Sequence, residues 1–155
     1  MLTAIALSCS TFPVEFIERH RLECRAHDRG GEREFQFHLQ DRAPVLPVWH
    51  EGQLLIVRWG CRRAESRFLP CSGWTRLTTV EAGRWADWRA EEVVVPASLC
   101  FDNGVWYKVR QGFRSVFVRD ERGVARVYPI CEPASHYYQV MTRSAWMPAL
   151  VGERI

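Results

Sequence analysis

The stretch VVVPASLCFDNGVWYK, residues Val93–Lys108, decides how this chain is expected to fold. Val93–Phe101 is mostly apolar, which predicts a strand that is buried on both faces. Asn103-Gly104 is the strongest hairpin signal in the sequence, because both residues tolerate the positive φ of a type I′ turn. We therefore expect Val93–Phe101 to pair in antiparallel fashion with Val105–Arg110.

Alternating apolar and polar residues predict further strands on either side of this hairpin. Downstream they cover Ser115–Asp120, Val124–Cys131 and Tyr137–Thr142, with turns at Gly112 and Gly123. Upstream they cover Phe35–Leu39, Val45–Trp49, Gln53–Trp59 and Thr75–Val80. Between the last two of these, residues 60–73 form a long irregular stretch rich in arginine, and we expect it to be a functional loop.

Helices are expected only at the margins. Pro13–Cys24 carries apolar residues at helical spacing, with Thr11 as its cap. A competing interpretation places Leu22, Cys24 and Ala26 on one face of a strand. Glu81–Ala90 is the second helical candidate. The sequence thus predicts an α+β, strand-rich single domain over residues 1–155, with a mainly antiparallel sheet or barrel-like core and one to three short peripheral helices.

Composition excludes several classes of protein. The chain has 155 residues, a formal charge of +3 and 47% hydrophobic residues, so it is neither disordered nor strongly basic. No apolar run approaches the roughly 18 residues that span a bilayer, so we expect no membrane association and a cytoplasmic location. Six widely and irregularly spaced cysteines in a chain of this size favour free thiols over disulfides.

Neither a metal nor a cofactor is expected. There is no CxxC pair, and Cys24-x-x-His27 lacks a partner pair downstream. The five histidines show no paired ligand spacing. One basic residue, Lys108, is a lysine, and the other twenty are arginines. Arginine suits phosphate contacts, but a GC-rich genome explains the same bias, and both explanations stay open.

An ordered set of short motifs between Asp41 and Pro148 resembles the SOS response-associated peptidase family. The set comprises Ala43-Pro44 with the strand after it, Arg58-Trp59-Gly60, Trp74-Thr75-Arg76, the segment Pro96–Asn103, and Ser144–Pro148. Members of that family bind single-stranded DNA and cross-link to abasic sites through a cysteine at position 2. The resemblance implies a related scaffold, a role in DNA damage and the SOS response, and a phage or prophage setting.

The chemical groups of that family are mostly replaced. Leu2 stands where the family has cysteine, and Trp74 where it has the active-site asparagine. Asp102 falls at the catalytic glutamate, and Ser144, or in a second placement Gly152, falls at the histidine. Because a large second residue blocks removal of the initiator methionine, we expect Met1 to remain. No 1,2-aminothiol then forms, and thiazolidine cross-linking is expected to be lost.

Asp102 has two interpretations. The resemblance makes it the remaining acid–base carboxylate. Asp102-Asn103-Gly104 is also a turn sequence, in which an aspartate bonds its own backbone, and we favour this second role.

An arginine-aromatic surface is what a sequence-tolerant single-strand groove needs, because bases stack and phosphates pair with guanidinium groups. The candidates are Arg58, Trp59, Arg62, Arg63, Trp74 and Arg76. The alternative is that the tryptophans belong to the core, and for Trp85, Trp88 and Trp106 we adopt it.

The expected function is binding of single-stranded or abasic DNA. One alternative is an active abasic-site or peptidase-like enzyme that uses Cys9 or Cys61 as its nucleophile. His136 is a candidate replacement base for such an enzyme, although a solvated turn position suits it better. A second alternative is an interaction protein with no DNA role.

Overall fold

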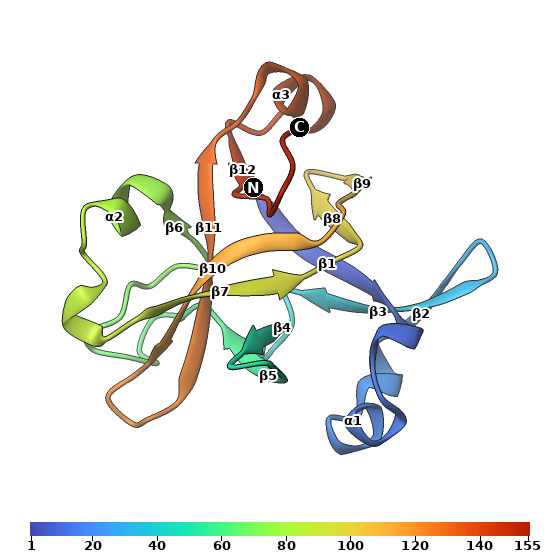
Figure 1. The fold of residues 1–155 in the computed structure, drawn as a ribbon, viewed down its shortest axis with the longest axis horizontal. Helices are drawn as coiled ribbons and strands as arrows, with labels where there is room; N and C mark the ends of the chain where they lie inside the picture. Colours follow the sequence, from blue (N-terminus) through green and yellow to red (C-terminus); the bar gives the residue numbers. More distant parts are fainter.

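The computed structural model describes residues 1–155 as a strand-rich α+β fold (Figure 1). Its strands are β1 Leu2–Ser8, β2 Ala26–Arg29, β3 Glu32–His38, β4 Val45–His50, β5 Gln53–Trp59, β6 Thr75–Arg76, β7 Glu91–Pro96, β8 Leu99–Asp102, β9 Val105–Lys108, β10 Gly112–Arg119, β11 Ala125–Pro133 and β12 Trp146–Pro148. Three α-helices accompany them: α1 Val14–Arg19, α2 Leu77–Glu81 and α3 His136–Thr142. The predicted fold class is confirmed.

The strands form two sheets. One is five-stranded and antiparallel, in the order β2-β3-β1-β8-β9. The other runs β10-β7-β4-β5-β11, and a further β10–β11 pairing closes it into a barrel. The short strands β6 and β12 flank the far half of β11. Pairing is antiparallel throughout, except where β5 and β6 lie parallel to β11.

The Asn103-Gly104 hairpin is confirmed. Both residues have positive φ, 48° and 87°, as a type I′ turn requires. The predicted continuous strand Val93–Phe101 is instead two strands. β7 ends at Pro96, where the proline lacks an N–H donor, and the chain then passes from the barrel to the five-stranded sheet.

Two hydrophobic clusters fill the space between these elements. The larger contains Leu2, Ile5, Phe37, Trp59 and Tyr138 among its buried members and joins the two sheets. The smaller lies on the other face of β11, where Tyr128 and Ile130 pack with Trp85. Successive side chains of a strand point to opposite faces, so Val127 joins the larger cluster and Tyr128 and Ile130 join the smaller one.

The strand predicted at Tyr137–Thr142 is wrong, because these residues form α3. Ser135 caps this helix by accepting a hydrogen bond from the Tyr138 backbone N–H. Tyr138 and Thr142, four residues apart, are both buried, whereas Tyr137 and Val140 are exposed. The buried residues thus follow helical spacing, although the aromatic and β-branched residues of the segment favour a strand.

The remaining helix predictions are only partly right. α1 is shorter than Pro13–Cys24, because Arg21 adopts a left-handed conformation with φ 52°; a 3-10 turn over Leu22–Arg25 follows. Thr11 does not cap α1, since Pro13 holds the cap position. The competing strand at Leu22–Ala26 is also wrong.

Between Thr75 and Ala90 the elements differ from those predicted. The strand predicted at Thr75–Val80 ends at Arg76, and α2 begins at Leu77. The helix predicted at Glu81–Ala90 is replaced by the last residue of α2, turns, and a short 3-10 helix over Ala86–Trp88. All six cysteines are free, as expected. None of the helices has the length and apolar character needed to cross a bilayer.

Candidate functional site

Asp102 lies at the end of β8, and its side chain points into the protein. The register of the five-stranded sheet sets Asp102 opposite Leu2, so the start of β1 runs beside this carboxylate. Asp102 is 0% exposed. The turn interpretation of Asp102 is therefore wrong: Asn103 and Gly104 take the turn positions, and the carboxylate forms hydrogen bonds to distant residues.

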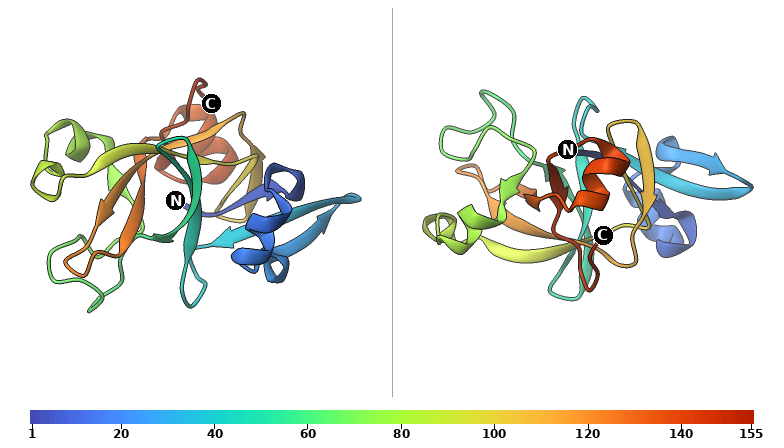
Figure 2. Two further views of the ribbon diagram at one scale, coloured as in Figure 1. Left: turned by 60° about the horizontal axis from the view of Figure 1, so that its bottom comes forward. Right: turned by 90° about the horizontal axis from the view of Figure 1, so that it is seen from above.

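The α-amine of Met1 is the first partner of this carboxylate. It donates to Asp102 Oδ1 at 2.7 Å, across 101 residues of sequence, and to Ser144 Oγ at 2.9 Å. The Ser144 hydroxyl in turn donates to Asp102 Oδ1 at 2.7 Å. Amine, hydroxyl and carboxylate thus form a closed triangle. Figures 1 and 2 place the N-terminus beside β12 and α3, the elements on either side of Ser144.

A pair of buried tyrosines lies at the second carboxylate oxygen, and one of them bonds it directly. The Tyr138 hydroxyl donates to Asp102 Oδ2 at 2.7 Å, and Tyr107 and Tyr138 share a hydrogen bond of 3.0 Å between their hydroxyls. Burial raises the pKa of both phenols well above the ordinary value, and the adjacent Asp102 adds to this effect. Both tyrosines therefore remain protonated donors throughout the neutral range.

The end of α3 positions Ser144. Arg143, with φ 59°, ends the helix in the left-handed conformation and turns the chain back. The Ser144 N–H donates to Thr142 Oγ1, and the Thr142 hydroxyl donates to the Tyr138 carbonyl. Asn103 Nδ2 donates to the Thr142 carbonyl, which ties the hairpin turn to the same helix. The helix, the hairpin and the N-terminus are thereby joined around Asp102.

Aromatic and basic side chains border this triangle. The Trp74 indole N–H donates to the Leu2 carbonyl at 2.9 Å. Exposed Arg76 lies over the Trp146 ring, 4.5 Å from its centroid. Burial raises the pKa of Cys131, and the charges of Arg76 and the Met1 amine oppose this, so both cations lie within electrostatic reach of one thiol.

The six residues predicted to contact DNA do not lie together in the structure. Trp59 is 2% exposed, and its indole donates to the Gly73 carbonyl, so its ring belongs to the core. Arg58 points to the opposite face of β5 and pairs with Glu65 at 2.8 Å. Arg58 and Trp59 therefore do not share a groove with Arg76, contrary to what the predicted single-strand groove requires.

Arg62 and Arg63 belong to the loop after β5. Arg62 donates to the backbone carbonyls of Leu39, Asp41 and Arg42, which gives it a structural task. Arg63 is exposed, and both arginines line a surface cavity of about 290 Å³ together with Cys71. Of the six candidates, Trp74 and Arg76 are the two that lie at the N-terminal site.

Neither candidate thiol reaches Asp102. Cys9 directly follows the far end of β1, and burial raises its pKa. Cys61 is buried next to Arg126 and Glu65, and burial raises its pKa as well. A raised pKa disfavours the nucleophilic thiolate. His136 is exposed at the first position of α3 and has no hydrogen bond to the carboxylate.

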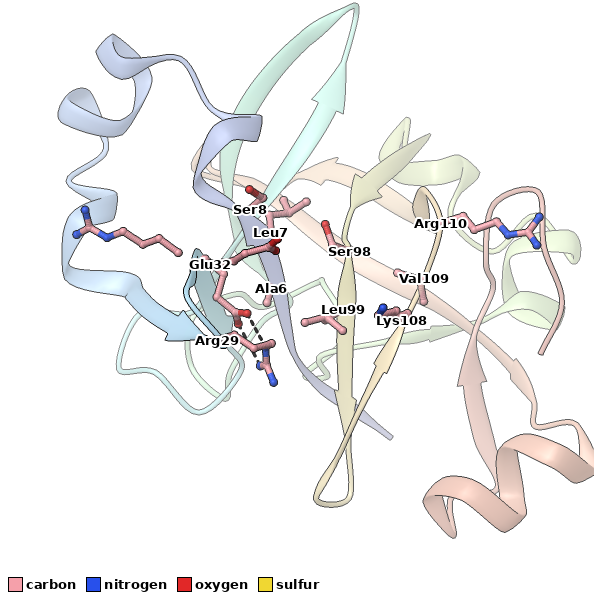
Figure 3. Close-up of a pocket in the computed structure, with 12 residues that line it drawn as sticks. Ala6, Leu7, Ser8, Arg29, Glu32, Ser98, Leu99, Lys108, Val109 and Arg110 are labelled. Atoms are coloured by element: carbon pink, nitrogen blue, oxygen red, sulfur yellow. Dashed lines mark hydrogen bonds and ion pairs between the residues drawn. The ribbon is translucent and has the colours of Figure 1, made fainter.

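A separate cavity of about 470 Å³ opens near the far end of β1 (Figure 3). Ala6, Leu7 and Leu99 contribute apolar lining. Arg29 and Glu34 meet at its wall in a bidentate pair, with distances of 2.6 and 3.1 Å. Its lining carries basic residues (Arg29, Arg33, Lys108 and Arg110) and acidic ones (Glu32 and Glu34), and it lies away from the Met1 amine.

The sequence signals identified some of the site and missed the rest. Asp102, Ser144 and Trp74, the positions matched to family motifs, do come together. Tyr138 was missed because its segment was interpreted as a strand; Ser135, a helix-start signal three residues earlier, could have corrected this. No family model matches the chain, and it matches no curated protein and no solved structure.

Proposed function

We propose that this chain binds single-stranded DNA and receives abasic sites at its N-terminal amine, as a divergent relative of the SOS response-associated peptidase family. The observation that carries the proposal is the triangle of the Met1 amine, Asp102 and Ser144. Asp102 and Ser144 align with the family's glutamate and histidine, and Trp74, aligned with its asparagine, contacts residue 2. The positions that the resemblance matches to the family's active-site residues thus lie close together, which supports the relationship.

The chemistry follows from the groups present. The open form of an abasic deoxyribose carries an aldehyde, and a primary amine condenses with an aldehyde to an imine with loss of water. Asp102 is placed to take a proton from the Met1 amine, and Ser144 to hydrogen-bond the departing oxygen. Leu2 supplies no thiol to close a thiazolidine. The adduct is therefore an imine that water hydrolyses again.

The DNA surface of this proposal is smaller than the sequence suggested. It consists of Trp74, Arg76 and Trp146, which border the amine, with exposed Arg143 at the end of α3. Guanidinium groups pair with phosphates, and indole rings stack on bases without sequence preference. Arg58, Trp59 and Arg62 are assigned to the scaffold, since each makes a polar contact within the protein: with Glu65, with the Gly73 carbonyl, and with backbone carbonyls, respectively.

A reductive trap tests the amine directly. A preparation whose first residue is verified as Met1 by intact mass is incubated with an oligonucleotide carrying one abasic site, with or without borohydride. We expect a covalent band on a denaturing gel only with borohydride, since reduction fixes the imine as an amine. An N-terminal extension, which moves the amine away from Asp102, should abolish the band, and a C-terminal extension should not.

Three outcomes contradict the proposal in different ways. A stable band without reductant that vanishes in Cys9→Ala or Cys61→Ala favours a thiol enzyme. An equal band from the N-terminally extended protein assigns the reaction to another amine, with Lys108 the first suspect. No binding of any oligonucleotide at low salt favours an interaction protein without a DNA role.

A further inference from the structure

His50, Glu51 and Glu91 meet on the barrel, away from the N-terminal site. His50 ends β4, Glu51 stands in the turn to β5, and Glu91 begins β7. Their candidate ligand atoms, one imidazole nitrogen and two carboxylate oxygens, all lie within 4.8 Å of one another. Two carboxylates this close repel each other unless a positive charge lies between them.

The imidazole is fixed in position by packing. The His50 ring stacks on Phe117, with centroids 4.3 Å apart and an interplanar angle of 19°. Phe117 is the cross-strand partner of Glu91, so the same pairing sets the carboxylate beside the ring. His50 Nε2 lies 2.8 Å from Glu91 Oε2. This contact orients both groups, whereas no hydrogen bond or ion pair within the protein engages the Glu51 carboxylate.

The spacing suits a transition-metal ion. Zinc lies about 2.0–2.2 Å from histidine nitrogen and carboxylate oxygen, so two tetrahedral ligands are roughly 3.4 Å apart. His50 Nε2 and Glu91 Oε2 are 2.8 Å apart and all three ligand atoms lie within 4.8 Å of one another, so small side-chain adjustments reach that spacing. Glu51 and Glu91 are exposed and free to adjust. A nitrogen ligand favours zinc-like ions over calcium and magnesium, which prefer oxygen alone.

We propose that His50, Glu51 and Glu91 bind one divalent cation of the zinc class, with water completing its coordination. The site is independent of the DNA proposal. It connects the tip of the β4–β5 hairpin to β7. Strands β4 and β7 pair with each other at one position, Trp49 with Val94. A bound ion therefore fastens the hairpin to the barrel wall, and its binding free energy adds to the stability of the folded state.

Calorimetric titration with Zn²⁺ tests this site. Exposed thiols such as those of Cys24 and Cys71 are potential zinc ligands, so the titration uses a Cys24→Ser/Cys71→Ser background after treatment with chelator. We expect one ion per chain and a rise in melting temperature. His50→Ala should abolish both, and Glu51→Gln should raise Kd roughly tenfold or more, because ligand charge sets affinity. His136→Ala, which removes an exposed histidine elsewhere, is the matched control.

Glu51→Gln keeps the test decisive if His50→Ala fails to fold, since Glu51 is an exposed turn residue. Unchanged zinc affinity in Glu51→Gln and Glu91→Gln would overturn the proposal. So would a titration of the background protein that shows no one-to-one binding.

Discussion

At the scale of single residues, the molecule depends on the fully buried carboxylate of Asp102. Asp102 accepts three hydrogen bonds, from the Met1 amine, the Ser144 hydroxyl and the Tyr138 hydroxyl. A buried charge is tolerated only when such partners replace its hydration. We therefore expect removal of a hydrogen-bond partner of Asp102 to lower the free energy of unfolding more than removal of an exposed hydroxyl on the same element.

Tyr138→Phe tests this dependence. The change removes the donor to Asp102 Oδ2 and the partner of the Tyr107 hydroxyl, while it keeps the packed ring. Leaving buried polar groups unpaired costs about 1–3 kcal/mol, so the free energy of unfolding in urea should fall by that amount. Tyr137→Phe, on the exposed side of α3, is the control and should leave stability unchanged. Equal effects of the two changes would contradict the role of this hydrogen bond.

Asp102 also marks the limit of local sequence patterns. Asp-Asn-Gly is a strong turn signal, and the turn does form at Asn103 and Gly104. The direction of the Asp102 side chain depends on a pairing with Leu2 across 100 residues of chain, which no local signal contains. The family resemblance identified Asp102 as a site residue, whereas turn propensity assigned it to the turn.

At the scale of elements, α3 carries Tyr138 into the site and ends directly before Ser144. Ser135→Ala removes its side-chain cap, the hydrogen bond accepted from the Tyr138 N–H. Loss of a cap costs about 1 kcal/mol. Thermal or urea unfolding should detect this loss, and Ser10→Ala, at an exposed position after β1, is the control. An unchanged midpoint for Ser135→Ala would show that tertiary contacts alone hold the helix.

The prediction of elements succeeded where local geometry decides and failed where packing decides. Glu51-Gly52 and Asn103-Gly104 require positive φ, so their hairpins were predictable. His136–Thr142 is short and aromatic, and its helical form depends on the Ser135 cap and on burial of Tyr138 against Tyr107. The break in Val93–Phe101 likewise depends on which sheet each half joins.

At the scale of the whole molecule, an ion-pair network joins three segments of the barrel. Arg126, on β11, contacts Asp120 at 3.0 Å and Glu65 at 3.1 Å, and Glu65 also pairs with Arg58 on β5. Burial acts to raise the pKa of Asp120 and Glu65, but hydrogen bonds from Arg126 and from backbone N–H groups outweigh it, so both pKa values are lowered. The folded state thus binds protons less readily than the unfolded chain.

Stability should therefore fall in acid. A carboxylate with a lowered folded pKa stabilises the fold above its unfolded pKa, about 4, and loses this contribution as pH falls through the folded value. Urea unfolding between pH 7 and pH 3 should give a declining free energy below about pH 4. Asp120→Asn should be less stable at neutral pH and should show a flatter decline. If the free energy of unfolding of Asp120→Asn declined as steeply as that of the unchanged protein, Asp120 would not contribute to the pH dependence.

The DNA proposal is also tested at this scale, because its surface combines α3, β6 and β12. Each phosphate contact to a single strand adds about 0.7 to the slope of log affinity against log salt. Arg76→Ala should weaken binding of a single-stranded oligonucleotide and lower that slope by about 0.7, measured by fluorescence anisotropy. Arg122→Ala is the matched control, since exposed Arg122 lies in the β10–β11 turn, at the opposite end of β11 from Arg76 (Figure 1). Equal losses in both variants would indicate diffuse charge attraction, and no loss in Arg76→Ala would place any DNA surface away from the N-terminal amine.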